Sequence, residues 1–245
     1  MVLESLLRSP FYRPLSVLVA DRLTSALAPM LSRLPRGVPV YSASGDTLEA
    51  ISGFALHRGI LAIGERGTPP SPDTLLSRLS PQSTVLLLSA IANHDNMGGL
   101  FRNAAAFGAD AILIDPDCCD PLYRKAIRVS TGSVLHVPFS RLDRGFDPIA
   151  LLERHGFAAF GLSPEGVLPL DQLEPPMRLA ILFGAEGPGL ASDLLERTRT
   201  VRIPMVEVMD SINVATASGI VLHHIAVRRS QDQAGRNASA SPLMQ

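Results

Sequence analysis

Residues 181–189 read Ile-Leu-Phe-Gly-Ala-Glu-Gly-Pro-Gly, and residues 201–213 read Val-Arg-Ile-Pro-Met-Val-Glu-Val-Met-Asp-Ser-Ile-Asn. Each segment begins as a short apolar strand and then breaks into a turn that carries polar groups. The three glycines of the first turn permit backbone conformations that bring amide groups against a ligand, and they leave Glu186 exposed. Ser211 and Asn213 precede a predicted helix, so each can cap it, present its side chain to a ligand, or do both. Taken alone, the first turn also fits an ordinary β-turn, and the second an ordinary helix cap.

A third segment, Asn-Met-Gly-Gly-Leu-Phe-Arg at residues 96–102, lies upstream. It follows a continuous apolar run at 84–89, typical of a buried parallel strand, and it opens a predicted helix. Gly98 and Gly99 are poor helix formers, so a close approach of backbone or ligand would account for them. The structural alternative is an ordinary N-cap at Asn96 and a solvent-facing arginine six residues later.

Composition restricts the class of protein. The chain has 245 residues and 46% hydrophobic content, enough for a large core, and no apolar run reaches the ~18 residues needed to span a bilayer. The N-terminus lacks a basic flank followed by a sustained apolar region, so we expect no signal peptide, no membrane contact and a cytoplasmic location. The net charge of −1 gives no electrostatic indication of nucleic-acid binding.

The potential metal ligands have unsuitable spacing. Cys118 and Cys119 are adjacent, which suits neither a structural disulfide nor a tetrahedral zinc site. His223 and His224 are neighbours on a predicted helix and point apart. We therefore predict no metal site and a reducing compartment.

Strand and helix signals alternate along the chain, which predicts an α/β fold with a mostly parallel sheet. The proline-rich stretch after residue 66 predicts a domain boundary, with a small domain at 1–66, a linker at 67–82 and a larger domain at 83–230. The polar residues 231–245 predict a disordered tail. The predicted strands are 16–20, 38–41, 60–65, 84–89, 111–114, 134–138, 157–161, 178–183 and 200–203. The predicted helices are 4–8, 21–34, 46–52, 73–79, 98–107, 122–129, 148–155 and 214–229.

Two features of the larger domain have two interpretations each. On the last predicted helix, Val214, Ala217, Val221 and Ile225 form an apolar stripe that is either core or dimer interface. His94 flanks the third segment and is either an RNA contact or, as we favour, a surface loop histidine.

Together the three segments resemble the motifs of the SpoU/TrmH family of RNA ribose 2′-O-methyltransferases, in the SPOUT superfamily. The family's motifs are an asparagine with an arginine six residues later, then Gly-x-Glu-Gly-x-Gly, then Ile-Pro-Met followed by Ser-x-Asn before a helix. The similarity covers roughly residues 84–229, and Ser130 and Gly132 also fit the family pattern. The matching residues are Asn96 and Arg102; Gly184, Glu186, Gly187 and Gly189; and Ile203, Pro204, Met205, Ser211 and Asn213.

The resemblance implies a SPOUT fold, in which the C-terminal segment threads a loop to form a trefoil knot, against the usual rule for chain topology. It implies a homodimer whose active site forms across both subunits. It implies that S-adenosylmethionine is held mainly by backbone groups of three loops, which here contain Gly184, Ile203 and Ile212. The implied catalytic residues are Asn96, Arg102, Glu186, Ser211 and Asn213.

The implied reaction moves a methyl group to a ribose 2′-oxygen of rRNA or tRNA. The family assigns Arg102 to the activation of that hydroxyl. A guanidinium stays charged below pH ~12, so contact with phosphate and stabilisation of a developing alkoxide are easier roles for this arginine. The other catalytic residues would position the arginine, the ribose and the cofactor.

The N-terminal part resembles the ribosomal-protein-L30e-like substrate-binding domain of rRNA-directed family members. Its clearest similarity is the segment 53–59, where His57 and Arg58 either contact RNA or belong to an ordinary helix-to-strand loop. Such a domain normally has a strand and an RNA-facing loop before its first long helix. This chain starts almost at once with a short helix at 4–8, so we expect the domain to be N-terminally incomplete.

Two other functions compete with this interpretation. A nucleotide-dependent oxidoreductase would place its glycine fingerprint after the first strand, whereas this glycine turn follows a late strand and lacks the G-x-G-x-x-G pattern. A non-catalytic RNA-binding or assembly protein on the same fold would have no need to retain all five catalytic residues.

Overall fold

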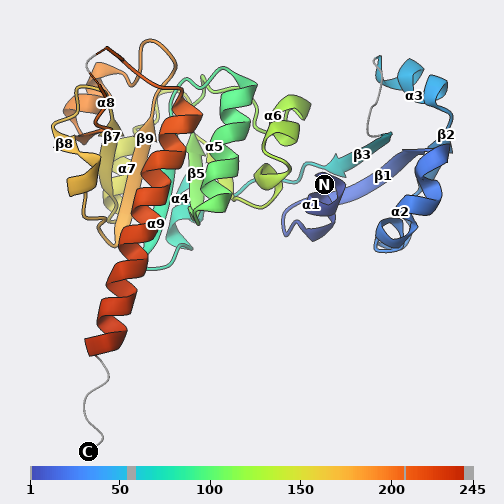
Figure 1. Ribbon diagram of the computed structural model, residues 1–245, viewed down its shortest axis with the longest axis horizontal. Helices are drawn as coiled ribbons and strands as arrows, with labels where there is room; N and C mark the ends of the chain where they lie inside the picture. The colour runs from blue at the N-terminus through green and yellow to red at the C-terminus, as the bar shows by residue number, and fades with distance from the viewer. Residues whose placement is uncertain (1, 54–58, 207, 240–245) are drawn as a thin grey trace, which may run out of the picture. The chain divides into compact units, whose positions relative to one another are not determined.

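The computed structural model describes residues 2–53, 59–206 and 208–239, the last seven of them by their backbone (Figure 1). The chain forms two compact units, and the division falls between Thr68 and Pro69. The predicted α/β class with a mostly parallel sheet is confirmed. None of the helices in this described part is long and apolar enough to cross a membrane.

The first unit contains a three-stranded sheet in the order β2-β1-β3. Strand β1 pairs in parallel with β2 and antiparallel with β3. Buried Leu3, Leu6, Val17, Val19 and Leu48 form its core. The elements are α1 (Val2–Arg8), β1 (Arg13–Ala20), α2 (Thr24–Leu31), β2 (Val40–Ala43), α3 (Gly45–Ser52) and β3 (Ile60–Glu65). The proposed RNA contacts His57 and Arg58 lie outside the described residues.

The second unit contains a seven-stranded sheet in the order β6-β5-β4-β9-β7-β10-β8, and all its strand pairs are parallel. Its strands are β4 (Ser83–Leu88), β5 (Ala111–Ile114), β6 (Phe139–Arg141), β7 (Ala158–Leu162), β8 (Leu168–Pro169), β9 (Arg178–Phe183) and β10 (Arg199–Arg202). Its helices are α4 (Pro72–Ser77), α5 (His94–Ala106), α6 (Arg124–Val129), α7 (Pro148–Arg154), α8 (Ser192–Glu196) and α9 (Val214–Ser239).

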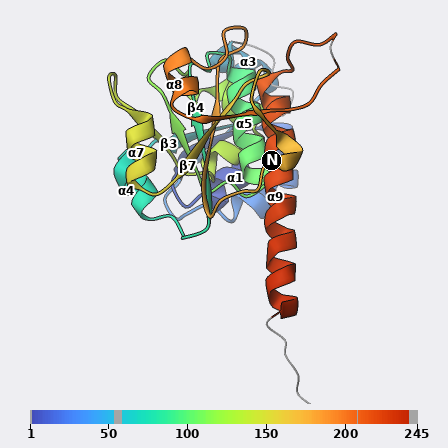
Figure 2. The same cartoon turned by 90° about the vertical axis from the view of Figure 1, so that its left-hand side faces the viewer.

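Helices cover both faces of this sheet, which explains why its central strands are apolar throughout. Helices α5 and α9 pack together on one face, and α4 and α7 lie on the other (Figure 2). Alternate side chains of β4 point to opposite faces of the sheet. Val85 and Leu87 belong to the hydrophobic cluster under α4 and α7, whereas Leu86 and Leu88 are buried on the opposite face. All six residues of β4 are buried.

The structure differs from the sequence prediction in several elements. The strand predicted at 134–138 is wrong: Ser133–Leu135 form a 3₁₀ turn, and the strand starts at Phe139. Helix α4 packs against β5 and β6, so part of the predicted linker belongs to the second unit. Helix α9 continues to Ser239, beyond the predicted start of the tail at 231. Strand β8 and helix α8 had no predicted counterpart.

Candidate active site

The candidate site is a cavity of about 320 Å³ at the C-terminal ends of β9 and β10, beside the start of α9. This is the edge where open parallel sheets bind ligands. All three predicted cofactor-binding residues line it, namely Gly184, Ile203 and Ile212, together with the predicted catalytic residues Glu186, Ser211 and Asn213. The remaining lining residues are Leu162, Ser163, Pro164, Phe183, Ala185, Gly187, Gly189, Met205, Val214 and Ala217.

The turn after β9 folds tightly back on itself. The amide of Gly189 donates to the carbonyl oxygen of Ala185 at 3.0 Å, closing an isolated antiparallel bridge. A Cβ atom on Gly184 would lie 2.2 Å from the carbonyl carbon of Gly189, so no side chain fits there. Gly187 has a φ of +86°, in the left-handed region that favours glycine. The turn therefore depends on backbone shape, and it leaves the Glu186 side chain exposed at the cavity.

Asn213 joins the three sequence motifs. Its Nδ2 atom donates to Oδ1 of Asn96 at 2.9 Å and to Oε1 of Glu186 at 3.0 Å. Its Oδ1 atom accepts from the amides of Ala215 and Thr216, at 2.9 and 3.2 Å, which caps the start of α9. The predicted helix cap is therefore present at Asn213, and the other end of the same amide group bonds to Asn96 and Glu186.

Asn96 lies inside α5, where it is buried with 6% exposure, and it is not the N-cap. The cap is Asn93, whose side chain accepts from the amide of Asp95 at 2.7 Å, so the helix begins at His94, four residues earlier than predicted. Sequence periodicity missed this start because the two glycines suppress helix propensity there.

Close helix packing explains those glycines. A Cβ on Gly98 would lie 2.8 Å from the carbonyl oxygen of Ala126 in α6, and a Cβ on Gly99 would lie 2.6 Å from Cβ of Ala215 in α9. The missing side chains let α5 approach both neighbouring helices. This approach brings Asn96 within hydrogen-bonding distance of Asn213.

Arg102 differs from the other predicted catalytic residues. Its side chain is exposed, does not line the cavity, and has no hydrogen-bond or ion-pair partner within the described part of the chain. Ser211 is also exposed but lies at the cavity. The structure thus gathers Asn96, Glu186 and Asn213 into one hydrogen-bonded group and leaves Arg102 open to solvent.

Asn103, next to Arg102, is a structural residue that sequence reasoning missed. Its Nδ2 atom donates to the carbonyl oxygen of Ala215 at 2.6 Å and to Oγ of buried Ser218 at 2.9 Å. These bonds tie α5 to α9 about two turns of α5 beyond the Asn96–Asn213 contact. The available sequence signal was a polar residue beside the arginine, on a helix whose glycines indicated a close approach of backbone or ligand.

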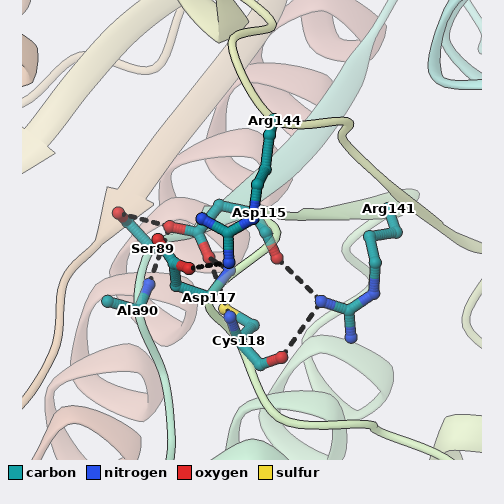
Figure 3. A network of polar contacts seen from close by, with 7 residues as sticks. All are labelled: Ser89, Ala90, Asp115, Asp117, Cys118, Arg141 and Arg144. Carbon is teal, nitrogen blue, oxygen red and sulfur yellow. Dashed lines mark hydrogen bonds and ion pairs between the residues drawn. The ribbon is translucent and has the colours of Figure 1, made fainter.

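A second polar network supports the loop that leads from β4 into α5 (Figure 3). Asp115 Oδ2 accepts from Oγ of Ser89 and from the amide of Ala90, both at 2.8 Å. Its Oδ1 accepts from the amides of Asp117 and Cys118 at 3.0 and 2.9 Å. Ala90 has a φ of +55°, a conformation that this carboxylate holds in place.

The sulfur of Cys118 belongs to the same network. It donates to the carbonyl oxygen of Leu88 at 3.3 Å and accepts from the amide of Ile91 at 3.3 Å. Burial raises the pKa of this thiol well above its usual range, so it remains protonated and serves structure. Among the described residues, no three His, Cys, Asp or Glu side chains form a group that could hold a metal ion.

The part of the chain that carries the three motifs matches known proteins. Residues 83–223 match the SpoU rRNA Methylase family. An uncharacterised tRNA/rRNA methyltransferase of Mycobacterium bovis is 36% identical over 228 residues, covering 91% of this chain and 77% of that protein. The 23S rRNA (guanosine-2′-O-)-methyltransferase RlmB of Acinetobacter baylyi is 29% identical over 201 residues, covering 80% of this chain and 81% of that protein.

Solved structures share the fold. The SpoU methyltransferase AviRb of Streptomyces viridochromogenes, in complex with the cofactor AdoMet, has a TM-score of 0.80 at 21% identity and covers 93% of this chain and 88% of that chain. An AdoMet-bound rRNA methyltransferase of Sinorhizobium meliloti has a TM-score of 0.75 at 22% identity. The match covers 93% of this chain and 84% of that chain.

Proposed function

Because this chain belongs to the SpoU rRNA methylase family and is therefore an RNA methyltransferase, we propose that it transfers the methyl group of S-adenosylmethionine to a ribose 2′-hydroxyl of rRNA or tRNA. The observation that carries the proposal is the Asn213 side chain. Its Nδ2 atom bonds to both Asn96 and Glu186, and so links residues from all three motifs; Glu186 and Asn213 line one cavity.

The cavity fits the proposed cofactor. Its volume of about 320 Å³ suits a small nucleoside-containing molecule, and its walls combine apolar side chains with the backbone of a glycine turn. Gly184, Ile203 and Ile212 lie where the backbone of three segments can hold such a ligand. When bound there, S-adenosylmethionine supplies an electrophilic methyl group on a positively charged sulfur.

The residues around the cavity then have different roles. Asn96, Glu186 and Asn213 form a hydrogen-bonded group that orients the ribose beside the cavity. Arg102 is exposed and without a protein partner in the described part of the chain, so its guanidinium is available to an RNA phosphate and to the negative charge that develops on the 2′-oxygen. Ser211 lies at the cavity and can contact either reactant.

Calorimetry with S-adenosylmethionine and NAD tests the cofactor. We expect binding of the former only, and tight NAD binding alone would favour the oxidoreductase alternative. Transfer of a labelled methyl group to RNA from cells that lack this protein tests the reaction. Methyl groups that map to ribose 2′-oxygens support the proposal. Cofactor binding without any transfer would favour the non-catalytic alternative.

A homodimer is part of the proposal. Three residues of the apolar stripe predicted as core or interface belong to the core, because Ala217, Val221 and Ile225 are at most 5% exposed, whereas Val214 is half-buried at the cavity. The outer face of α9 instead exposes Ile220 and Val227, at 41% and 40%. We expect Ile220→Asp to shift the protein from dimer to monomer in sedimentation analysis and to lower activity with it. A fully active monomer would contradict an active site shared between subunits.

Three further features belong to the same proposal. The C-terminal segment forms the trefoil knot implied by the family, the first unit is an L30e-like RNA-binding domain, and the protein works in the cytoplasm. We expect Arg58→Ala to weaken RNA binding in a filter assay while cofactor affinity stays unchanged. Unchanged RNA affinity would remove this arginine from the RNA contacts.

A further inference from the structure

The site described above leaves an aromatic pair beside it unexplained. The rings of His94 and Tyr123 lie 4.4 Å apart between centroids and are tilted by 45°. His94 is the first residue of α5, two positions before Asn96, and Tyr123 is the residue before α6. Although one ring packs against the other, Tyr123 remains 53% exposed. The larger part of an aromatic side chain therefore faces solvent close to the catalytic asparagine.

Three features of the fold position the elements that carry this pair. Lys125 Nζ bonds to Oδ2 of Asp95 at 2.7 Å, which joins the first turns of α5 and α6. Gly98 lets the two helices pack without a side chain between them. The loop before α6 is closed by the amide of Leu122, which donates to Oδ1 of Asp120 at 2.9 Å. An ordered aromatic surface loses little conformational freedom when a flat ligand stacks on it.

The charge around the pair favours a nucleic acid. Arg124 and Arg128 are exposed on the short helix that starts beside Tyr123, and the Arg128 side chain has no partner within the described residues. Asp95 is paired with Lys125, so it does not neutralise Arg128. Exposed aromatic rings next to cationic side chains are the combination that binds single-stranded nucleic acid, because bases stack on rings and phosphates meet arginines.

On the basis of the proposed function, we infer that His94 and Tyr123 form a stacking platform for an unpaired RNA base that neighbours the methylated nucleotide, and that Arg128 contacts the adjoining phosphate. The RNA would cross α6 and the start of α5 as its target ribose enters the group around Asn96. Such a platform selects single-stranded or unstacked targets and tolerates different bases, since every base has a flat face.

Methyl transfer to total rRNA and tRNA from cells that lack this protein tests the inference. We expect Tyr123→Ala to raise KM for RNA about tenfold, with unchanged kcat and cofactor affinity, and Tyr123→Phe and Tyr123→Trp to restore it. Met177→Ala is the control, because Met177 is 47% exposed and precedes β9 at the opposite end of the strands from the cavity. Unchanged KM in Tyr123→Ala overturns the inference while wild-type transfer upholds the proposed function. Absence of wild-type transfer counts against the function itself.

Two further measurements separate the platform from a fold defect or an interface. Arg128→Gln should reduce the slope of log affinity against log salt by about one in filter binding with the same RNA. Sedimentation of Tyr123→Ala should show the wild-type oligomeric state. A change of oligomeric state would assign the surface to contact between copies of the chain, and an unchanged salt slope would remove the phosphate contact.

Discussion

The glycine turn at 184–189 and helix α5 both contact Asn213, but the turn and the exposed face of α5 are built in opposite ways. The turn is specified by backbone shape: Gly184 has no room for a Cβ atom, and Gly189 closes the turn through a backbone hydrogen bond. The face of α5 presents Arg102, an exposed side chain with no partner in the described residues. On the proposed function, the turn on the cofactor side depends on backbone shape, whereas the RNA side depends on the chemistry of single side chains.

The largest effect is expected at Gly184. In Gly184→Ala the new methyl group would collide with the backbone of Gly189, so the turn must open at a cost of about 3 kcal/mol or more. We expect lower thermal stability and loss of cofactor binding, measured by calorimetry. Gly187→Ala is the matched control, because its Cβ meets nothing within 4 Å and only the left-handed φ of +86° is unfavourable, by roughly 1–2 kcal/mol. Equal losses in both variants would disprove the argument from backbone contact.

Arg102→Ala tests the opposite region. Because this side chain is exposed and has no hydrogen-bond or ion-pair partner in the described residues, stability and cofactor affinity should remain at wild-type values. The methyl-transfer rate at saturating RNA should fall about 100-fold, the size expected when a group that stabilises developing charge is removed. Arg102→Lys should recover little, since it lacks the planar fork. A near-wild-type single-turnover rate for Arg102→Ala would exclude this residue from the catalytic set.

Asn213 offers a substitution that separates its two roles. Asn213→Asp keeps the oxygen that caps α9 but replaces the donor to Asn96 and Glu186 with a carboxylate oxygen. We expect modest destabilisation and a large loss of activity. Asn213→Ala removes the cap as well and should cost about 1 kcal/mol of stability for that loss. Thermal melts and transfer rates measured together check this, and an active Asn213→Asp would show that the bridge is dispensable.

The smallest effect concerns a surface pair remote from both regions. Oδ2 of Asp147 accepts from Arg197 at 2.9 Å, and its Oδ1 caps α7. The hydrogen bond from Arg197, followed by those from the α7 amides, lowers the pKa of Asp147. Its charge therefore stabilises the fold above the unfolded carboxyl pKa of about 3.9, and this contribution disappears as pH falls through the lower folded pKa.

Asp147→Asn keeps a good cap and removes only the charge. Its melting temperature should be slightly below wild type at pH 7 and should converge with wild type in acid below the folded pKa. A melting-temperature difference that grows towards acid pH would show that the charge of Asp147 does not stabilise the fold in the assigned way.

Several elements followed directly from sequence pattern. Strands β5 and β9 have the predicted bounds, because a continuous apolar run between turn residues has few alternatives in a sheet covered on both faces. Strand β3 also has the predicted bounds, although its residues are half-buried or exposed. The family predicted from the three motifs is confirmed. Gly184, Ile203 and Ile212, which the family resemblance assigned to three cofactor loops, line one cavity.

Hydrophobic periodicity gave the wrong structure or the wrong boundary at two places. The stretch at 134–138 is apolar like a strand, but Gly132 precedes it with a φ of +89° and turns the chain into a 3₁₀ segment. Helix α5 starts at His94 because Asn93 caps it, although the glycines that follow weaken helix propensity. In both places a turn or cap decided the structure, and hydrophobic periodicity carries no record of such features.

By itself, then, the sequence determined the α/β class, the positions of the main strands and the identity of the three motifs, since these depend on local composition and spacing. Only the tertiary structure decided which motif residues meet. The bond from Asn213 to Asn96 spans 117 positions and exists because two glycines let α5 pack against α6 and α9. The openness of Arg102 and the pairing of His94 with Tyr123 likewise follow from helix packing. Such contacts join residues that are remote in sequence, and no local pattern encodes the distance between them.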